Sequence, residues 1–107
     1  MRLIADETVT IHVSSVSLWE LRLKWSSMTI RGDRKGPLAP DRALAFVEGR
    51  CWPILPLAAT HAVATLDTPL DHSDPFDELL LVQAQVEGLR LLTRDARLRD
   101  HPLVLAV

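Results

Sequence analysis

Hydrophobic and polar residues follow each other in a pattern that predicts strands separated by helices. Residues 8–13 alternate and are rich in β-branched side chains, which is typical of a strand. The apolar segments 89–93 and 103–107 also predict strands, and residues 51–57 predict a short edge strand because they contain two prolines. Strands that alternate with helices favour an α/β fold, in which helices cover both faces of a short, mainly parallel sheet.

Helix-boundary residues place the helices between these strands. One helix is predicted to begin at residues 15–17, where Ser17 and Glu20 have the spacing of a capping box. Residues 28–40 are rich in Gly, Pro and charge and predict a loop. Further helices are predicted at residues 41–48, 58–66 and 75–87. The last has Asp74 at the N-cap, Pro75 at the first helical position and Gly88 just past its end.

Length and composition indicate one globular domain spanning residues 1–107. The chain is 48% hydrophobic and 24% charged, which argues against disorder. Its net charge of −2 provides no general basic field for nucleic acid, so any such chemistry needs a local site. The single cysteine, Cys51, excludes an internal disulfide and is expected to be buried. With no secretory signal pattern and no apolar run of about 20 residues, we expect a cytoplasmic protein without membrane contact.

Four carboxylates are predicted to meet at one edge of the sheet. In an α/β layer the start of each helix lies beside the end of a strand, which is the edge where open sheets bind ligands. The acids near such ends are Glu20, Asp74, Asp77 and Asp95. Carboxylates gathered in this way repel one another unless a cation lies between them, and such oxygen ligands suit Mg²⁺ or Mn²⁺.

Helix stability explains these acids to different degrees. Asp74 is fully explained as an N-cap, which contributes about 1 kcal/mol. For Glu20, the capping box and a metal site are equally good explanations. Asp77 gains only the helix-dipole term of about 0.3–1 kcal/mol, and a turn after Thr93 accepts many residues besides Asp95. Asp77 and Asp95 are therefore the stronger candidates for chemistry.

Other polar residues near this edge have simple structural explanations. His72 is more readily explained as a loop histidine than as a ligand, because no second histidine has ligand spacing to it. Arg94, Arg97 and Arg99 are typical of a solvated face, but beside a metal they are suited to binding RNA phosphates.

Three blocks of the sequence resemble a known family. V-S-S-V-S-L-W-E-L with Lys24 beyond it, H-S-D-P-F-D-E-L-L-L-V-Q-A-Q, and G-L-R-L-L-T-R-D resemble successive motifs of the PIN domain, and most of all those of VapC-type toxins of toxin–antitoxin pairs. The resemblance implies a Mg²⁺-dependent endoribonuclease that acts on RNA, is usually a homodimer and is silenced by a cognate antitoxin.

The resemblance also implies roles for individual residues. Glu20, Asp77 and Asp95 correspond to acids that hold the metal and carry catalysis, and Asp74 and His72 to residues around them. Weaker candidates for RNA binding are Lys24, Arg94 and Arg97.

The amino end departs from the family pattern. Family members open with a strand in the middle of the sheet that ends in the first metal-binding aspartate. This chain begins at what resembles the tail of the following helix, residues 1–6, so we expect an N-terminally truncated PIN-like α/β/α fold. Asp6 precedes its strand and is predicted to lie at the wrong edge. A missing central strand leaves exposed edges or forces the neighbouring strands together.

Two other functions fit parts of the pattern. A catalytically inactive remnant that binds an antitoxin or self-associates is consistent with the missing aspartate. A receiver-type phosphotransfer domain also gathers acids at strand ends, but it needs paired acids after its first strand and a lysine after a late one, and neither is present.

Overall fold

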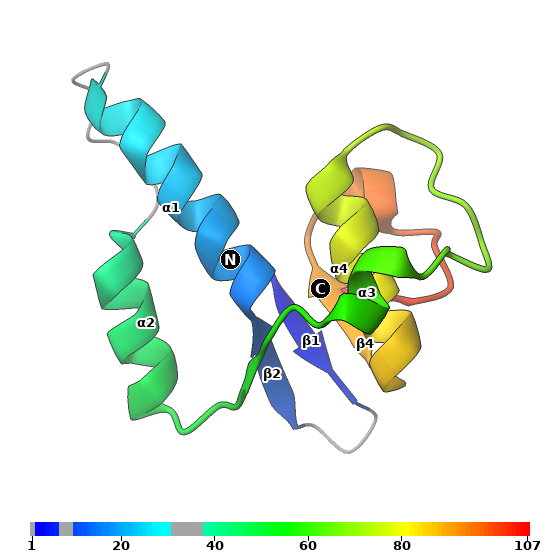
Figure 1. Ribbon diagram of the computed structural model, residues 1–107, viewed down its shortest axis with the longest axis horizontal. Coiled ribbons are helices and arrows are strands. Elements are labelled where there is room, and N and C mark those ends of the chain that lie inside the picture. The colour runs from blue at the N-terminus through cyan, green and yellow to red at the C-terminus, as the bar shows by residue number, and fades with distance from the viewer. Residues whose placement is uncertain (1, 7–9, 31–37) are drawn as a thin grey trace.

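The chain folds into one sheet with helices on both sides. The computed structural model describes residues 2–6, 10–30 and 38–107. The strands are β1 (Leu3–Ala5), β2 (Ile11–Ser14), β3 (Ile54–Leu55), β4 (Arg90–Thr93) and β5 (Val104–Ala106). The helices are α1 (Ser15–Ile30), α2 (Pro40–Gly49), α3 (Ala59–Val63), α4 (Pro75–Glu87) and the short 3₁₀ helix η1 (Ala96–Leu98). Figure 1 shows α1 and α2 on one side of the strands and α3 and α4 on the other.

The sheet has the strand order β3-β2-β1-β4-β5. β2 is parallel to β3, and β4 is parallel to β5, whereas β1 is antiparallel to both of its neighbours. Four strands therefore run in one direction and the central strand runs against them. The predicted α/β class with a mainly parallel sheet is confirmed, with β1 as the exception.

The prediction of a helix tail at the amino end is wrong, because residues 3–5 form the central strand. Ile4 pairs with His12 on one side and Leu91 on the other. Ile4 is 0% exposed and Ala5 is 6% exposed. The strand satisfies the backbone groups of β2 and β4, which an empty centre would leave unpaired. The expected gap in the sheet is thus filled by the chain's own first residues.

Helix α4 spans Pro75–Glu87, as predicted, and Gly88 follows it in the left-handed conformation with φ of 68°. The helix lies in the interior, since six of its residues are buried, including the polar Asp77 and Gln83. Gln83 accepts a hydrogen bond from Ser14 at the end of β2. This contact ties the middle of α4 to the point where β2 meets α1.

Other boundaries differ from the prediction. Helix α1 continues to Ile30, beyond the predicted loop start at residue 28, and residues 31–37 of that loop lie outside the described residues. Residues 8 and 9 of the predicted first strand are also outside them. Helix α3 is shorter than predicted. Cys51 is exposed, so the expectation that it is buried is wrong.

The core lies between the sheet and α4. Its buried members are apolar side chains from the strands, α1, the segment after α3, α4 and η1: Ile4, Val16, Leu66, Leu80, Leu81, Val82, Leu91, Leu98 and Val104. Burying a side chain of this size contributes about 1.5–3 kcal/mol. This packing fixes the start of α4 against the ends of the strands. Among the described residues, no helix has the length and apolar character needed to cross a membrane.

Candidate metal centre

The four predicted acids lie together at the edge of the sheet where β2 and β4 end. Glu20 comes from α1, Asp74 and Asp77 from the start of α4, and Asp95 from the turn after β4. Ion pairs through shared arginines connect all four. The elements predicted to meet at this edge do meet there, because the core holds α4 with its first turn beside the end of β4.

Asp74 and Asp77 have different roles in the first turn of α4. Asp74 is the N-cap, and its Oδ1 accepts hydrogen bonds from the backbone N–H groups of Phe76 at 2.9 Å and Asp77 at 3.2 Å. Its structural role is therefore confirmed. The Asp77 side chain is 0% exposed and faces the cluster. One carboxylate oxygen of Asp77, Oδ2, lies 2.8 Å from Nε2 of His72.

The other oxygen of Asp77 faces Arg2. Asp77 Oδ1 accepts no hydrogen bond from the part of the chain that the structure describes, but it forms an ion pair with Arg2. A buried carboxylate is costly unless a cation or hydrogen bonds compensate it. The Arg2 guanidinium is therefore the cation that compensates this oxygen.

The capping-box explanation for Glu20 is wrong. Helix α1 begins at Ser15, and Ser14 caps it by accepting a hydrogen bond from the backbone N–H of Val16 at 3.1 Å. Ser17 lies inside the helix, and its buried Oγ has no hydrogen-bond partner among the described residues. Glu20 is therefore beyond the first turn, and its carboxylate pairs with Arg2 and, at 3.7 Å, with Lys24. Ion pairs, not a capping box, are therefore the structural contacts of Glu20.

Asp95 has structural contacts that the sequence did not indicate. Its Oδ1 caps η1 by accepting from the backbone N–H of Arg97 at 3.0 Å. The Arg97 guanidinium also donates to both carboxylate oxygens, the shortest contact being 2.8 Å to Oδ2. The side-chain hydrogen bond from Arg97, with its backbone N–H next, lowers the pKa of Asp95 from 3.8 to about 2. Asp95 is therefore ionised at neutral pH.

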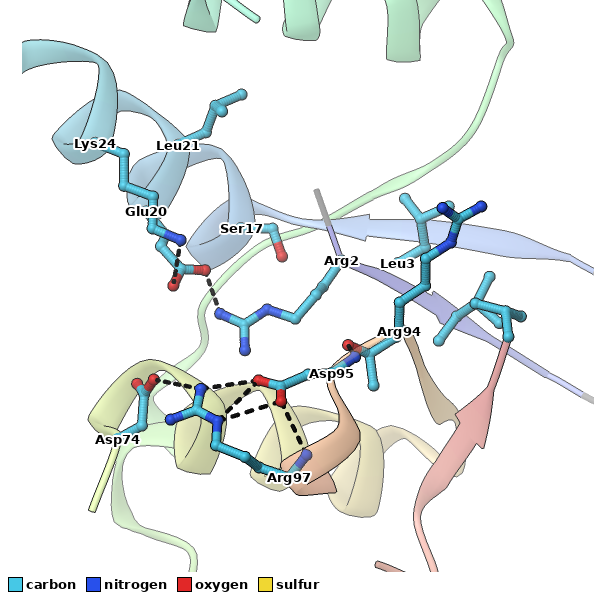
Figure 2. A pocket seen from close by; sticks show the side chains of 13 residues that line it. Arg2, Leu3, Ser17, Glu20, Leu21, Lys24, Asp74, Arg94, Asp95 and Arg97 are labelled. Atoms are coloured by element: carbon cyan, nitrogen blue, oxygen red, sulfur yellow. Dashed lines mark hydrogen bonds and ion pairs between the residues drawn. The ribbon is translucent and has the colours of Figure 1, made fainter. Parts of the chain in front are cut away.

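Two arginines pair with the carboxylates of the cluster. Figure 2 shows the Arg2 side chain pointing toward Glu20, and Arg97 lying between Asp74 and Asp95. Arg97 reaches Asp77 Oδ2 at 3.6 Å and Asp74 Oδ2 at 3.9 Å as well. The sequence pattern indicates Arg97 only as a weak RNA-binding candidate and does not single out Arg2. The apolar residues after Arg2 signal a short strand, but nothing local indicates which edge that strand brings it to.

Among the described residues, one group of side chains has donor atoms close enough together to hold a metal ion. One donor atom each of His72, Asp74 and Asp77 lie within 4.8 Å of one another. Glu20 and Asp95 lie outside this group and are joined to Asp77 through Arg2 and Arg97. A cavity of about 640 Å³ opens over this edge. Its polar lining consists of Arg2, Ser17, Glu20, Lys24, Asp74, Thr93, Arg94, Asp95 and Arg97.

Replacing Arg97 with glutamine is expected to raise the pKa of Asp95 from about 2 toward 3.8. The folded-state pKa of Asp95 lies below its unfolded value, so its ionised form stabilises the fold above about pH 4. In the parent, this contribution to the free energy of unfolding declines as the pH falls from about 4 to about 2. Carboxyl ¹³C NMR titration measures the shift directly. Arg99→Gln, on the exposed end of η1, is the matched control, and an unchanged Asp95 pKa in Arg97→Gln contradicts the assignment.

Comparison with known proteins identifies one family. A family model described as the PIN domain matches residues 1–102. No curated protein and no solved structure gives a match.

Proposed function

The chain belongs to the PIN domain family, whose members are generally nucleases, and on that premise we propose that it is a Mg²⁺- or Mn²⁺-dependent endoribonuclease. The observation that carries the proposal is Asp77. Its carboxylate is fully buried, its Oδ1 is compensated by the Arg2 ion pair rather than by a hydrogen bond, and it shares Arg2 with Glu20 and Arg97 with Asp95. A site of carboxylate oxygens with few other partners suits hard divalent cations.

The residues present fit such a cation. Glu20, Asp77 and Asp95 would hold it, and the hydrogen bond from His72 would orient the Asp77 carboxylate. When bound, the metal supplies an activated water and stabilises the negative charge that develops in phosphodiester cleavage. Asp74 fixes the helix start that places Asp77, so its contribution is to position a ligand.

RNA is the proposed substrate, and the cavity offers cations for its phosphates. Lys24 is 65% exposed and Arg97 is 59% exposed at their side chains. Arg94 is exposed and lines the same cavity. Exposed cations beside the carboxylates are suited to positioning a phosphate backbone over the site. By its resemblance to VapC-type toxins we further propose a cytoplasmic toxin that forms a homodimer and is silenced by an antitoxin.

The test is cleavage of RNA by the purified chain with and without Mg²⁺. We expect cleavage that EDTA abolishes and that Asp95→Asn reduces by about 10 to 100-fold, because the variant loses a metal ligand. Asp100→Asn, an exposed acid beyond η1, is the matched control and should cleave as the parent does. Cleavage that is indifferent to both EDTA and Asp95→Asn would refute the proposal.

A second function is favoured by the position of Arg2. Its guanidinium already pairs with Glu20 and Asp77, which is consistent with a catalytically inactive domain that binds an antitoxin or a second copy of itself. Antitoxin binding without RNA cleavage at saturating Mg²⁺ supports this alternative, and robust turnover excludes it.

A further inference from the structure

The reversed direction of β1 brings an arginine to the middle of the acidic edge. β1 is antiparallel to β4, with Leu3 paired to Leu92, so the residue before the strand lies where β4 ends. That residue is Arg2. The same reversal sends the other end of β1 to the opposite edge, where Asp6 Oδ1 accepts a hydrogen bond from the backbone N–H of Thr10 at 3.2 Å. The prediction that Asp6 lies at the wrong edge for a metal is therefore confirmed.

Arg2 bridges two of the proposed metal ligands. Nη1 of its guanidinium forms an ion pair with Asp77 Oδ1, and Nη2 forms one with Glu20 Oε1. The side chains of Arg2 and Glu20 are 16% and 13% exposed, and that of Asp77 is 0% exposed. Buried carboxylates lose most of the water that would stabilise their charge. The Arg2 guanidinium compensates for that lost hydration because it lies between the two carboxylates.

A divalent cation shared by Glu20 and Asp77 needs the same carboxylate oxygens. The oxygen of Asp77 that has no hydrogen bond from the described residues is the one that Arg2 faces. The guanidinium and a metal ion repel each other, and the two carboxylates cannot coordinate both at close range. Metal binding and the Arg2 ion pairs are therefore mutually exclusive.

We propose that Arg2 is an internal competitor for the metal, which holds Glu20 and Asp77 until a divalent cation displaces it. The proposal rests on the metal-dependent function proposed above. Only molecules in which Arg2 has left the site can bind the metal. The observed affinity is therefore the intrinsic affinity multiplied by the fraction of such molecules. Removing the guanidinium removes this competition.

Calorimetric titration with Mn²⁺ tests the proposal on the full chain. We expect Arg2→Met to bind Mn²⁺ about 10 to 100-fold more tightly than the parent. Arg2→Lys keeps the charge but does not bridge two carboxylates with a planar fork, so its affinity should fall between the two. Arg42→Met, on the exposed face of α2, removes the same charge away from the site and should match the parent.

The outcomes separate this proposal from the one it rests on. If Arg2→Met binds Mn²⁺ as tightly as the parent or more weakly, the proposal that Arg2 competes with the metal is overturned, but the proposed metal site is not. An absence of binding in both the parent and Arg2→Met overturns both proposals. Circular dichroism of each variant establishes that it is folded before titration.

A second measurement does not depend on the Arg2→Met variant. The side-chain Nε–Hε NMR signal of Arg2 in the parent, assigned from its loss in Arg2→Lys, should shift as Mg²⁺ is added and saturate with the metal. A signal that stays unchanged at metal saturation overturns the proposal even if Arg2→Met fails to fold.

Discussion

Replacing Asp77 with asparagine is expected to reduce the rate of RNA cleavage by about 100-fold or more. Asp77 is the one acid of the cluster whose side chain is fully buried, and it lies between the arginines that contact Glu20 and Asp95. Asparagine keeps the size of the side chain but removes its charge, so a divalent cation at the proposed site would lose its most enclosed ligand. Even residues that only orient a metal ligand commonly contribute 10 to 100-fold, and a ligand should contribute at least as much.

Glu78→Gln is the matched control for Asp77→Asn. Glu78 is also acidic and in the first turn of α4, but it is exposed. Both variants remove one negative charge from the same helix terminus, where each loses about 0.3–1 kcal/mol of dipole stabilisation. Initial cleavage rates at saturating Mg²⁺, with the folded fraction measured by circular dichroism, compare them. Equal rates in folded Asp77→Asn and Glu78→Gln would remove Asp77 from the site.

Replacing Arg2 with methionine is expected to lower the free energy of unfolding by about 3–5 kcal/mol in metal-free buffer. The change leaves the fully buried Asp77 carboxylate without its closest cation, and breaking a buried ion pair from one side costs about this much. Urea unfolding in EDTA measures the loss. Arg42→Met, on the surface of α2, should stay within about 0.5 kcal/mol of the parent.

The double variant Arg2→Met/Asp77→Asn distinguishes a buried charge from lost packing. Because the double variant leaves no unpaired charge at Asp77, we expect it to be more stable than Arg2→Met alone. The two substitutions should therefore not be additive. Additive losses would show that Arg2 stabilises the fold through its aliphatic stem rather than through the ion pair with Asp77.

Helix α4 shows how far local sequence signals reach. Asp74, Pro75 and Gly88 marked its two ends, and the structure has the helix at those residues. An N-cap and a left-handed C-terminal residue act within about one turn, so a short stretch of sequence contains all the information they need. These local interactions do not use the Asp77 side chain, which is nevertheless fully buried.

Glu20 and Asp95 show where local signals mislead. The spacing of Ser17 and Glu20 fits a capping box, but Ser14 caps the helix, and its hydroxyl also donates a hydrogen bond to Gln83 on α4. The sequence pattern predicts no structural role for Asp95, yet it caps η1 and pairs with Arg97. For Glu20 the difference arises from how the start of α1 packs, and for Asp95 it arises from the short helix η1. The pattern of apolar residues describes neither.

The sequence by itself determined the α/β class, the span of α4, and the gathering of Glu20, Asp74, Asp77 and Asp95 at one sheet edge. These follow from periodicity and from helix-end residues, which act over a few positions. Only the tertiary structure decided that residues 3–5 form the central strand and that this strand runs against its neighbours. Strand direction depends on backbone pairing with residues about 90 positions away, and that pairing brings Arg2 to the carboxylates.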